Sequence, residues 1–162
     1  VEEKRGNLEE AIQLYGESLQ LSEAIGNREN ASFVATALAK LHLVFGDFEA
    51  ARQEIPIAKN QAELLGSNLA LTFALAGEAL LARLDGNPHT LQESTRRLRA
   101  FQDNRGGADL RVAQRVHEMG LMMLQRQHGT KRAESIAAIS DILEAIGAED
   151  LAADITERLP KE

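Results

Sequence analysis

Apolar residues recur along this chain at steps of three and four, which is the spacing of one face of an α-helix. One such series is Leu8, Ala11, Ile12, Tyr15 and Leu19. The sequence has no sustained apolar–polar alternation of the kind that predicts strands, and β-branched residues are sparse. The pattern therefore predicts an all-α protein with helices over residues 8–25, 29–45, 48–65, 68–85, 88–104, 108–128, 131–146 and 149–159.

Six glycines spaced by twenty residues mark the turns between these helices. They are Gly6, Gly26, Gly46, Gly66, Gly86 and Gly106, and Gly129 and Gly147 continue the series at intervals of 23 and 18. Glycine readily adopts the left-handed conformation that closes a helix, and the Asn, Asp or Ser that follows five of the six can cap the next helix. Short turns make neighbouring helices antiparallel. So regular a period favours an open solenoid over a closed bundle.

Alternate intervals differ in character, so the repeating unit is forty residues. Two sets of residues carry a recognisable pattern: Gly46, Phe48, Ala51, Ile55 and Ala58, and, almost as well, Gly6, Leu8, Ala11, Tyr15 and Ser18. At these positions the chain resembles the tetratricopeptide repeat, and its repeat length resembles the long variant of kinesin light chains and large bacterial ATP-dependent transcriptional regulators. The resemblance is strong over residues 6–66, weakens at Gly86 and is poor after residue 106.

The resemblance implies a right-handed superhelical solenoid of antiparallel helical hairpins. A single domain, 1–162, would hold a half repeat (1–26), three repeats (27–66, 67–106 and 107–147) and a closing helix (148–162). The chain begins at Val1 in a charged stretch, without an initiator Met or a signal peptide, so we expect a fragment of a longer protein. The family implies protein–protein interaction, here as the sensing or docking segment of a cytoplasmic bacterial regulator. The alternative is a self-association module that forms a homodimer through exposed ends or groove faces.

The residues show no constellation that would support catalysis. The four histidines lack the spacing of a metal-binding pair on one helix, and the glycines form no phosphate-binding loop. No Gly-x-Ser-x-Gly context exists for a nucleophile, and the absence of Cys removes thiolate chemistry. We therefore expect no enzyme, no cofactor and no metal. The longest apolar run, Leu69 to Ala82, is too short and interrupted to cross a membrane.

The net charge of −7 argues against nucleic-acid binding, but positive charge gathers in one block. Its nine cations are Arg96, Arg97, Arg99, Arg105, Arg111, Arg115, Arg126, Lys131 and Arg132. Nucleic-acid-binding surfaces usually interleave aromatic residues, and this block holds only Phe101. We expect the arginines to pair with neighbouring acidic helices. An acidic protein partner and, less favoured, nucleic acid are the alternatives.

The first helix of each hairpin lines the concave groove of tetratricopeptide arrays, and the resemblance places three sets of residues there. They are Phe33, Thr36, Lys40 and Leu43; Phe73, Ala76, Leu80 and Arg83; and Val116, Met119, Met123 and Arg126. Each set follows helical steps. Such a groove has an apolar floor with basic residues toward one end, which suits a protein or peptide partner with acidic groups. The alternative is that intramolecular packing closes the groove.

Four local features complete the expectations. Pro56, near the middle of helix 48–65, predicts a kink on the outer face, with a functional hinge as the alternative. Met119, Met122 and Met123 are expected to fill the core, with an adaptable binding surface as the alternative. Helix 68–85 is apolar nearly all round and should be the most buried. Helix 8–25 lacks the first helix of its repeat, which predicts partly uncovered apolar residues, Ile12, Tyr15 and Leu19, and dimerisation through that end or fraying of residues 1–7.

Overall fold

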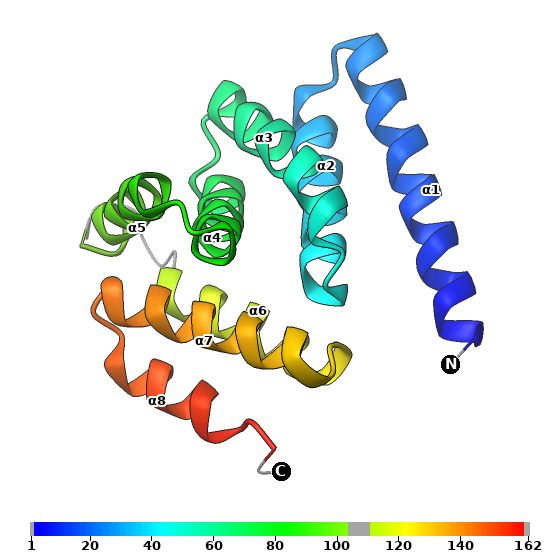
Figure 1. Ribbon diagram of the computed structural model, residues 1–162. Coiled ribbons are helices and arrows are strands. Elements are labelled where there is room, and N and C mark those ends of the chain that lie inside the picture. The colour runs from blue at the N-terminus through cyan, green and yellow to red at the C-terminus, as the bar shows by residue number, and fades with distance from the viewer. Residues whose placement is uncertain (1, 104–110, 161–162) are drawn as a thin grey trace.

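The computed structural model of this protein describes residues 2–103 and 111–160, which form eight α-helices and no strands (Figure 1). The helices are α1 (Glu2–Ile25), α2 (Arg28–Phe45), α3 (Phe48–Leu65), α4 (Asn68–Asp85), α5 (Pro88–Asp103), α6 (Val112–Arg126), α7 (Gly129–Ala145) and α8 (Glu149–Glu157). The predicted all-α class is confirmed for the described residues. The predicted bounds of α3 and α4 are those of the structure, and those of α2, α5, α7 and α8 lie within two residues.

Left-handed glycines close the helices α2, α3 and α4, as the twenty-residue spacing predicts. Their φ angles are 81°, 73° and 68° at Gly46, Gly66 and Gly86. The small polar residue in each turn then caps the next helix. A side-chain oxygen accepts the N–H of the residue three positions on, at Asn27, Asp47, Ser67 and Asn87. Both capping interactions are local, so they could be predicted from neighbouring residues alone.

Two glycines of the series do not close helices. Gly6 lies inside α1, which begins at Glu2, so helix 8–25 starts earlier than predicted. Gly129 is the first residue of α7, and the turn before it is made by extended backbone at Gln127. A glycine acts as a helix stop only where a helix ends and the chain folds back, and the described residues hold no helix before α1. The repeat boundary at Gly106 lies outside the described residues.

Helix α3 runs unbroken through Pro56, whose side chain is exposed. The predicted position of this proline on the outer face is therefore confirmed. A proline removes one backbone N–H donor from the helix. At an exposed position water can reach the carbonyl group that loses this donor. The kink itself stays a prediction.

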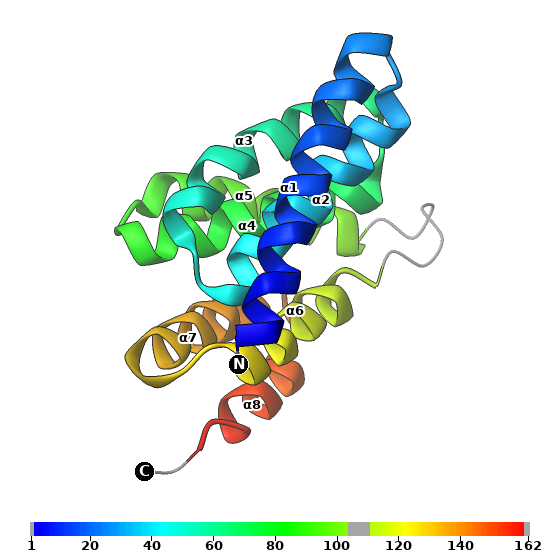
Figure 2. The same cartoon turned by 90° about the vertical axis from the view of Figure 1, so that its right-hand side faces the viewer.

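Helices α1 to α5 pack in chain order as antiparallel pairs, but the order changes after α5. Helix α6 lies against both α2 and α4, and α7 also lies against α4. The segment α6–α8 is accordingly found below α2–α5 in both views (Figures 1 and 2). In an open solenoid each hairpin contacts only its neighbours. The stack departs from that expectation, because α6 and α7 pack on the face of α2 and α4 that carries the predicted groove residues. We call this the inner face.

Helix α4 is the most buried helix of the described chain, as predicted from its nearly continuous apolar character. Ten of its residues are buried, more than in any other helix, and Leu75 and Leu80 are fully enclosed. Gly77 allows the close approach of two neighbours. A Cβ atom at this position would lie 2.8 Å from Leu43 Cδ1 and closer still to Ile55 Cδ1. The absence of a side chain therefore lets α2 and α3 pack tightly on α4.

Replacing Leu75 or Leu81 by alanine should lower the free energy of unfolding by about 2–5 kcal/mol, because each substitution leaves a cavity in the core. Urea unfolding followed by circular dichroism at the helix band measures the change. Leu69→Ala is the matched control, because this leucine is exposed on the same helix and its loss should cost less than about 0.5 kcal/mol. Losses that small at both Leu75 and Leu81 would contradict the packing around α4.

Candidate functional site

Six of the twelve predicted groove residues are buried between helices. They are Leu43, Ala76, Leu80, Val116, Met119 and Met123. The cause is the packing of α6 and α7 against α2 and α4, which places one predicted set against another. These six residues therefore do not line an accessible groove. The same burial confirms the expectation that Met119 and Met123 fill the core, while Met122 is half-buried.

Part of the inner face of α2 and α4 stays accessible. Phe33 is exposed there, and Lys40 is half-buried with its ammonium group 4.8 Å from the centre of the Phe73 ring. Beneath this pair lies a small hollow lined by Thr36 and Met119 among others, with room for no more than about one water molecule. The accessible part of the predicted groove is thus a surface with an aromatic side chain and a cation–π pair, and not a ligand cavity.

The other two predicted groove cations are held by intramolecular contacts. Arg83 Nε donates a hydrogen bond to Asp141 Oδ2 of α7 at 2.8 Å, which ties the end of α4 to the covering hairpin. The guanidinium of Arg126 lies 5.8 Å from the centre of the Phe45 ring. Both side chains remain exposed on one side. The pair between Arg83 and Asp141 neutralises one of the three charges that the predicted groove contributed.

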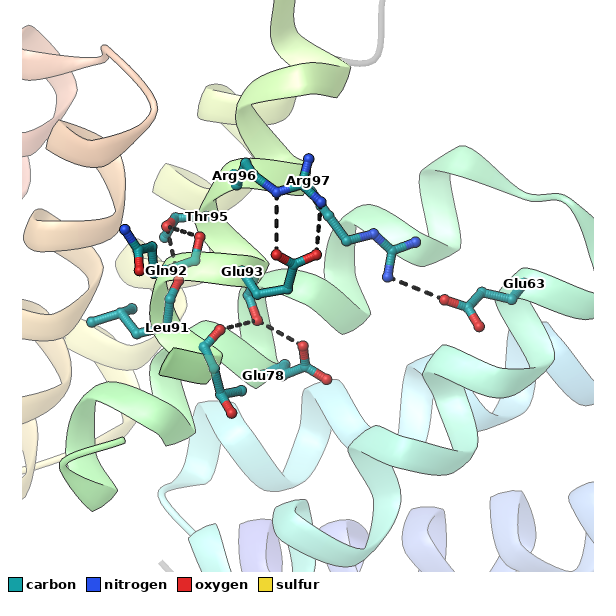
Figure 3. A network of polar contacts seen from close by, with 10 residues as sticks. Glu63, Glu78, Leu91, Gln92, Glu93, Thr95, Arg96 and Arg97 are labelled. Carbon is teal, nitrogen blue, oxygen red and sulfur yellow. Dashed lines mark hydrogen bonds and ion pairs between the residues drawn. The ribbon is translucent and has the colours of Figure 1, made fainter. Parts of the chain in front are cut away.

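The basic block is also engaged with its surroundings, as expected. Arg96 donates two hydrogen bonds to Glu93 on its own helix, and Arg97 reaches Glu63 of α3 at 3.2 Å (Figure 3). The hydrogen bond from Arg96 lowers the pKa of Glu93 below its ordinary value. Arg105 lies outside the described residues. The described contacts support the pairing of these arginines with acidic neighbours.

Gln127 joins the turn between α6 and α7 to the end of α2, and sequence reasoning missed it. Its amide Nε2 donates to the carbonyls of Leu43 and Val44 at 3.0 and 3.2 Å. Its Oε1 accepts a hydrogen bond from Ser135 at 2.6 Å, and both polar side chains are buried. The last four carbonyls of a helix lack partners within it. Gln127 therefore caps α2 from a position 84 residues away in the chain.

A partly buried polar network joins the α2–α3 hairpin to the α4–α5 hairpin. Glu78, which is labelled in Figure 3, accepts a hydrogen bond from Ser94 at 2.6 Å. It also accepts one from Lys59 at 2.9 Å, so it connects α3, α4 and α5. Ser94 is fully buried. A hydroxyl that donates to a carboxylate and cannot reach solvent is unsuited to nucleophilic attack on a substrate. The network is best explained as a link between helices.

Asp154 links α8 to α6. Its Oδ2 accepts a hydrogen bond from Arg158 Nε at 2.9 Å and lies 2.6 Å from His117 Nε2. The contact with Arg158, followed by that with His117, lowers the pKa of Asp154. Among the described residues, no group of three or more His, Cys, Asp or Glu side chains is placed to hold a metal ion. None of the described helices is both long and apolar enough to cross a membrane.

The most exposed large apolar side chains of the described chain lie on α1 and α2. The four most exposed large apolar side chains of the described chain are Leu14, Leu21, Ile25 and Phe33, at 57%, 63%, 68% and 66% of full exposure. We call these four residues the α1–α2 patch. The other exposed large apolar residues also precede α5: Phe45, Ile57, Leu64, Leu65 and Leu69. Exposed large apolar side chains are therefore confined to the first four helices of the described chain.

Asn30 of α2 contacts α1 on the face that carries three of the four patch residues. Leu14, Ser18, Leu21 and Ile25 follow each other at steps of four, three and four, so they share one face of α1. Ser18 accepts a hydrogen bond from Asn30 of α2 at 3.2 Å, and Phe33 lies one helical turn after Asn30. The side chain of Phe33 is therefore beside the leucine stripe.

Helix α1 does carry uncovered apolar residues, but they are not all the ones predicted. Ile12 and Tyr15 are half-buried, whereas Leu19 is buried and the expectation for it is wrong. These three residues share the face of α1 that packs on α2. The exposed stripe occupies a different face of the same helix. The helical period from Leu14 to Ile25 was available in the sequence as a signal for this second face.

Replacing Gln127 by alanine should lower the free energy of unfolding by about 1–3 kcal/mol, because the Val44 carbonyl and the buried Ser135 hydroxyl lose their partner. Gln114→Ala, on the preceding helix α6, is the control, because Gln114 is exposed and its loss should cost less than about 0.5 kcal/mol. Urea unfolding compares the two variants with the wild type. Equal stability of both variants would show that Gln127 does not fix the hairpin on α2.

Acid should weaken the attachment of α8 through Asp154. A carboxylate whose pKa is lowered by folding stabilises the folded state above its unfolded pKa of about 4, and that contribution is lost as the pH falls through the folded pKa. Asp154→Asn removes the titrating group, so its thermal midpoint should fall less between about pH 6 and pH 3 than that of the wild type. Asp150→Asn controls for the change of charge on α8. If the thermal midpoint of Asp154→Asn fell with pH as steeply as that of the wild type, this role of Asp154 would be contradicted.

Comparisons with protein-family models, with curated proteins and with solved structures found no match to this chain. The structure itself shows, for the described residues, an eight-helix, all-α protein of paired antiparallel helices, which is consistent with a repeat-like helical domain.

Proposed function

We propose that this chain is a protein–protein interaction module of tetratricopeptide type, serving as the sensing or docking segment of a larger bacterial regulator in the cytoplasm. The observation that carries the proposal is the α1–α2 patch. Contiguous apolar surface on a folded domain is typical of sites that bind other proteins. The stacked antiparallel hairpins and the glycine-closed turns support the family part of the proposal.

The polar clusters of the described chain favour binding over catalysis. The hydroxyl of Ser94 is enclosed between helices and bonded to Glu78. The contact between His117 and Asp154 is shared with Arg158, so it contributes to the attachment of α8. Each of these groups has a structural explanation. We accordingly propose no reaction, cofactor or metal for this chain.

The side chains around a binding site favour a partner of opposite charge. The three predicted groove cations, Lys40, Arg83 and Arg126, favoured acidic groups in the partner. Arg83 now has Asp141 as a counter-ion, and the other two lie beside aromatic rings. A partner with acidic groups thus remains a prediction that depends on Lys40 and Arg126.

Self-association through the same patch is the second candidate function. Among the described helices, α1 packs against α2, and it meets α3 through a hydrogen bond of 3.4 Å from Gln61 to Glu23. A helix with one neighbour and a second apolar face can acquire another neighbour by pairing with a second molecule. Sedimentation velocity across micromolar to millimolar concentrations separates this candidate from the binding of a different protein.

Phe33→Glu should weaken binding to helical peptides selected from a library by the wild-type protein, by at least tenfold, since truncating an aromatic anchor of an interface costs on the order of 2 kcal/mol. Leu64→Glu is the control, because Leu64 is 55% exposed on α3, outside the patch. It should retain wild-type affinity. If the selection yields no peptide and the protein stays monomeric at millimolar concentration, the interaction function is overturned.

A further inference from the structure

We infer that the α1–α2 patch binds an amphipathic helix whose apolar stripe is bordered by lysine or arginine side chains. This inference rests on the proposed interaction function and adds the chemistry of the partner. It reverses the charge expected from the predicted groove, because the accessible apolar surface lies on a different helix from most of that groove.

The shape of the patch suits a helix. Leu14 and Ile25 lie eleven residues apart, which corresponds to about 16 Å along α1 or three helical turns. The residue between the two leucines on this face is Ser18, a small side chain already bonded to Asn30. Phe33 stands beside the stripe on α2. A helix laid along α1 would therefore have three aliphatic side chains beneath it and one aromatic side chain at its flank.

The charge beside the stripe is acidic. Glu10 and Glu17 are exposed and lie one turn before Leu14 and Leu21 respectively, so both border the apolar stripe. Between Asn7 and Ile25, α1 carries four glutamates and no lysine, arginine or histidine. Cations on a docked helix would meet these carboxylates. Charge complementarity of this kind selects one partner over another and speeds association.

The same charges disfavour a second copy of this helix as the occupant. Two α1 stripes facing one another would place the Glu10 and Glu17 rows of both copies around one apolar seam. Like charges at such positions destabilise helix pairing. A partner helix with basic borders removes this repulsion. Lys40, two turns beyond Phe33 along α2, is held over the Phe73 ring and lies outside the stripe.

The test compares two synthetic 18-residue amphipathic peptides that share one leucine stripe and differ only on the polar face, which is lysine in one and glutamate in the other. Fluorescence anisotropy at low and high salt measures their binding to the full chain. We expect the lysine peptide to bind at least tenfold more tightly than the glutamate peptide. We also expect this preference to shrink as salt rises.

Three variants separate docking on the patch from general attraction to an acidic protein. Leu21→Glu adds a negative charge, so general attraction predicts tighter binding of the lysine peptide, whereas docking on the patch predicts at least a tenfold loss. Glu10→Lys combined with Glu17→Lys should reverse the preference between the two peptides. Leu64→Glu, which adds the same charge outside the patch, should leave the affinity unchanged. Circular dichroism confirms that each variant keeps the wild-type helix content.

Three results would overturn the inference. The first is equal or tighter binding of the glutamate peptide. If Phe33→Glu abolishes that binding, the interaction function stands and only the partner chemistry fails. The second is undiminished binding of the lysine peptide to Leu21→Glu, which would show attraction to the net charge alone. If neither peptide binds, the inference fails, and the library selection with Phe33→Glu then decides whether the interaction function survives.

Discussion

The arrangement of the helices depends on one constraint: α4 is apolar on nearly every side, so it has to be covered on all of them. Helices α2 and α3 cover one side at short range, because Gly77 leaves room for Leu43 and Ile55. Helix α5 covers another side. The inner side is covered by α6 and α7, and not by a single helix of the next hairpin. The closed inner face follows from the sequence of α4 as much as from that of α6.

Apolar burial brings the α6–α7 hairpin onto α2 and α4, and polar contacts then fix its register. Burial is roughly proportional to area and has no preferred direction, so it does not by itself select one position along a helix. Gln127 does, because its amide meets carbonyls at the end of α2 that have no partner within that helix. The ion pair between Arg83 and Asp141 fixes a second point on α7.

The features that could be predicted from the sequence depend on residues that are close together in the chain. A left-handed Gly46 followed by the capping Asp47 needs only adjacent residues, and the burial of α4 needs only its own composition. The contact of Gln127 with α2 could not be predicted this way, because no period relates residues 84 positions apart. The sequence nonetheless signals a change here, since the interval from Gly106 to Gly129 is three residues longer than the five intervals before it. That longer interval contains α6, the first helix of the hairpin that leaves the regular stack.

The candidate surface likewise combines local features that could be predicted with contacts between distant helices that could not. The resemblance placed Phe33, Met119 and Met123 along one groove, yet it could not show that packing would cover Met119 and Met123 and leave Phe33 exposed. The two ends of the α1–α5 stack also differ in a way that the repeat pattern does not require. The outward positions of α5 include Gln92, Arg96 and Arg99, and none of its described residues is an exposed large apolar side chain. Helix α1 instead presents a leucine stripe. Helix α5 also packs against α6 and α7, whereas α1 packs against α2. The leucine stripe is thus the apolar face that the fold itself leaves uncovered, and the proposed docked helix would cover it.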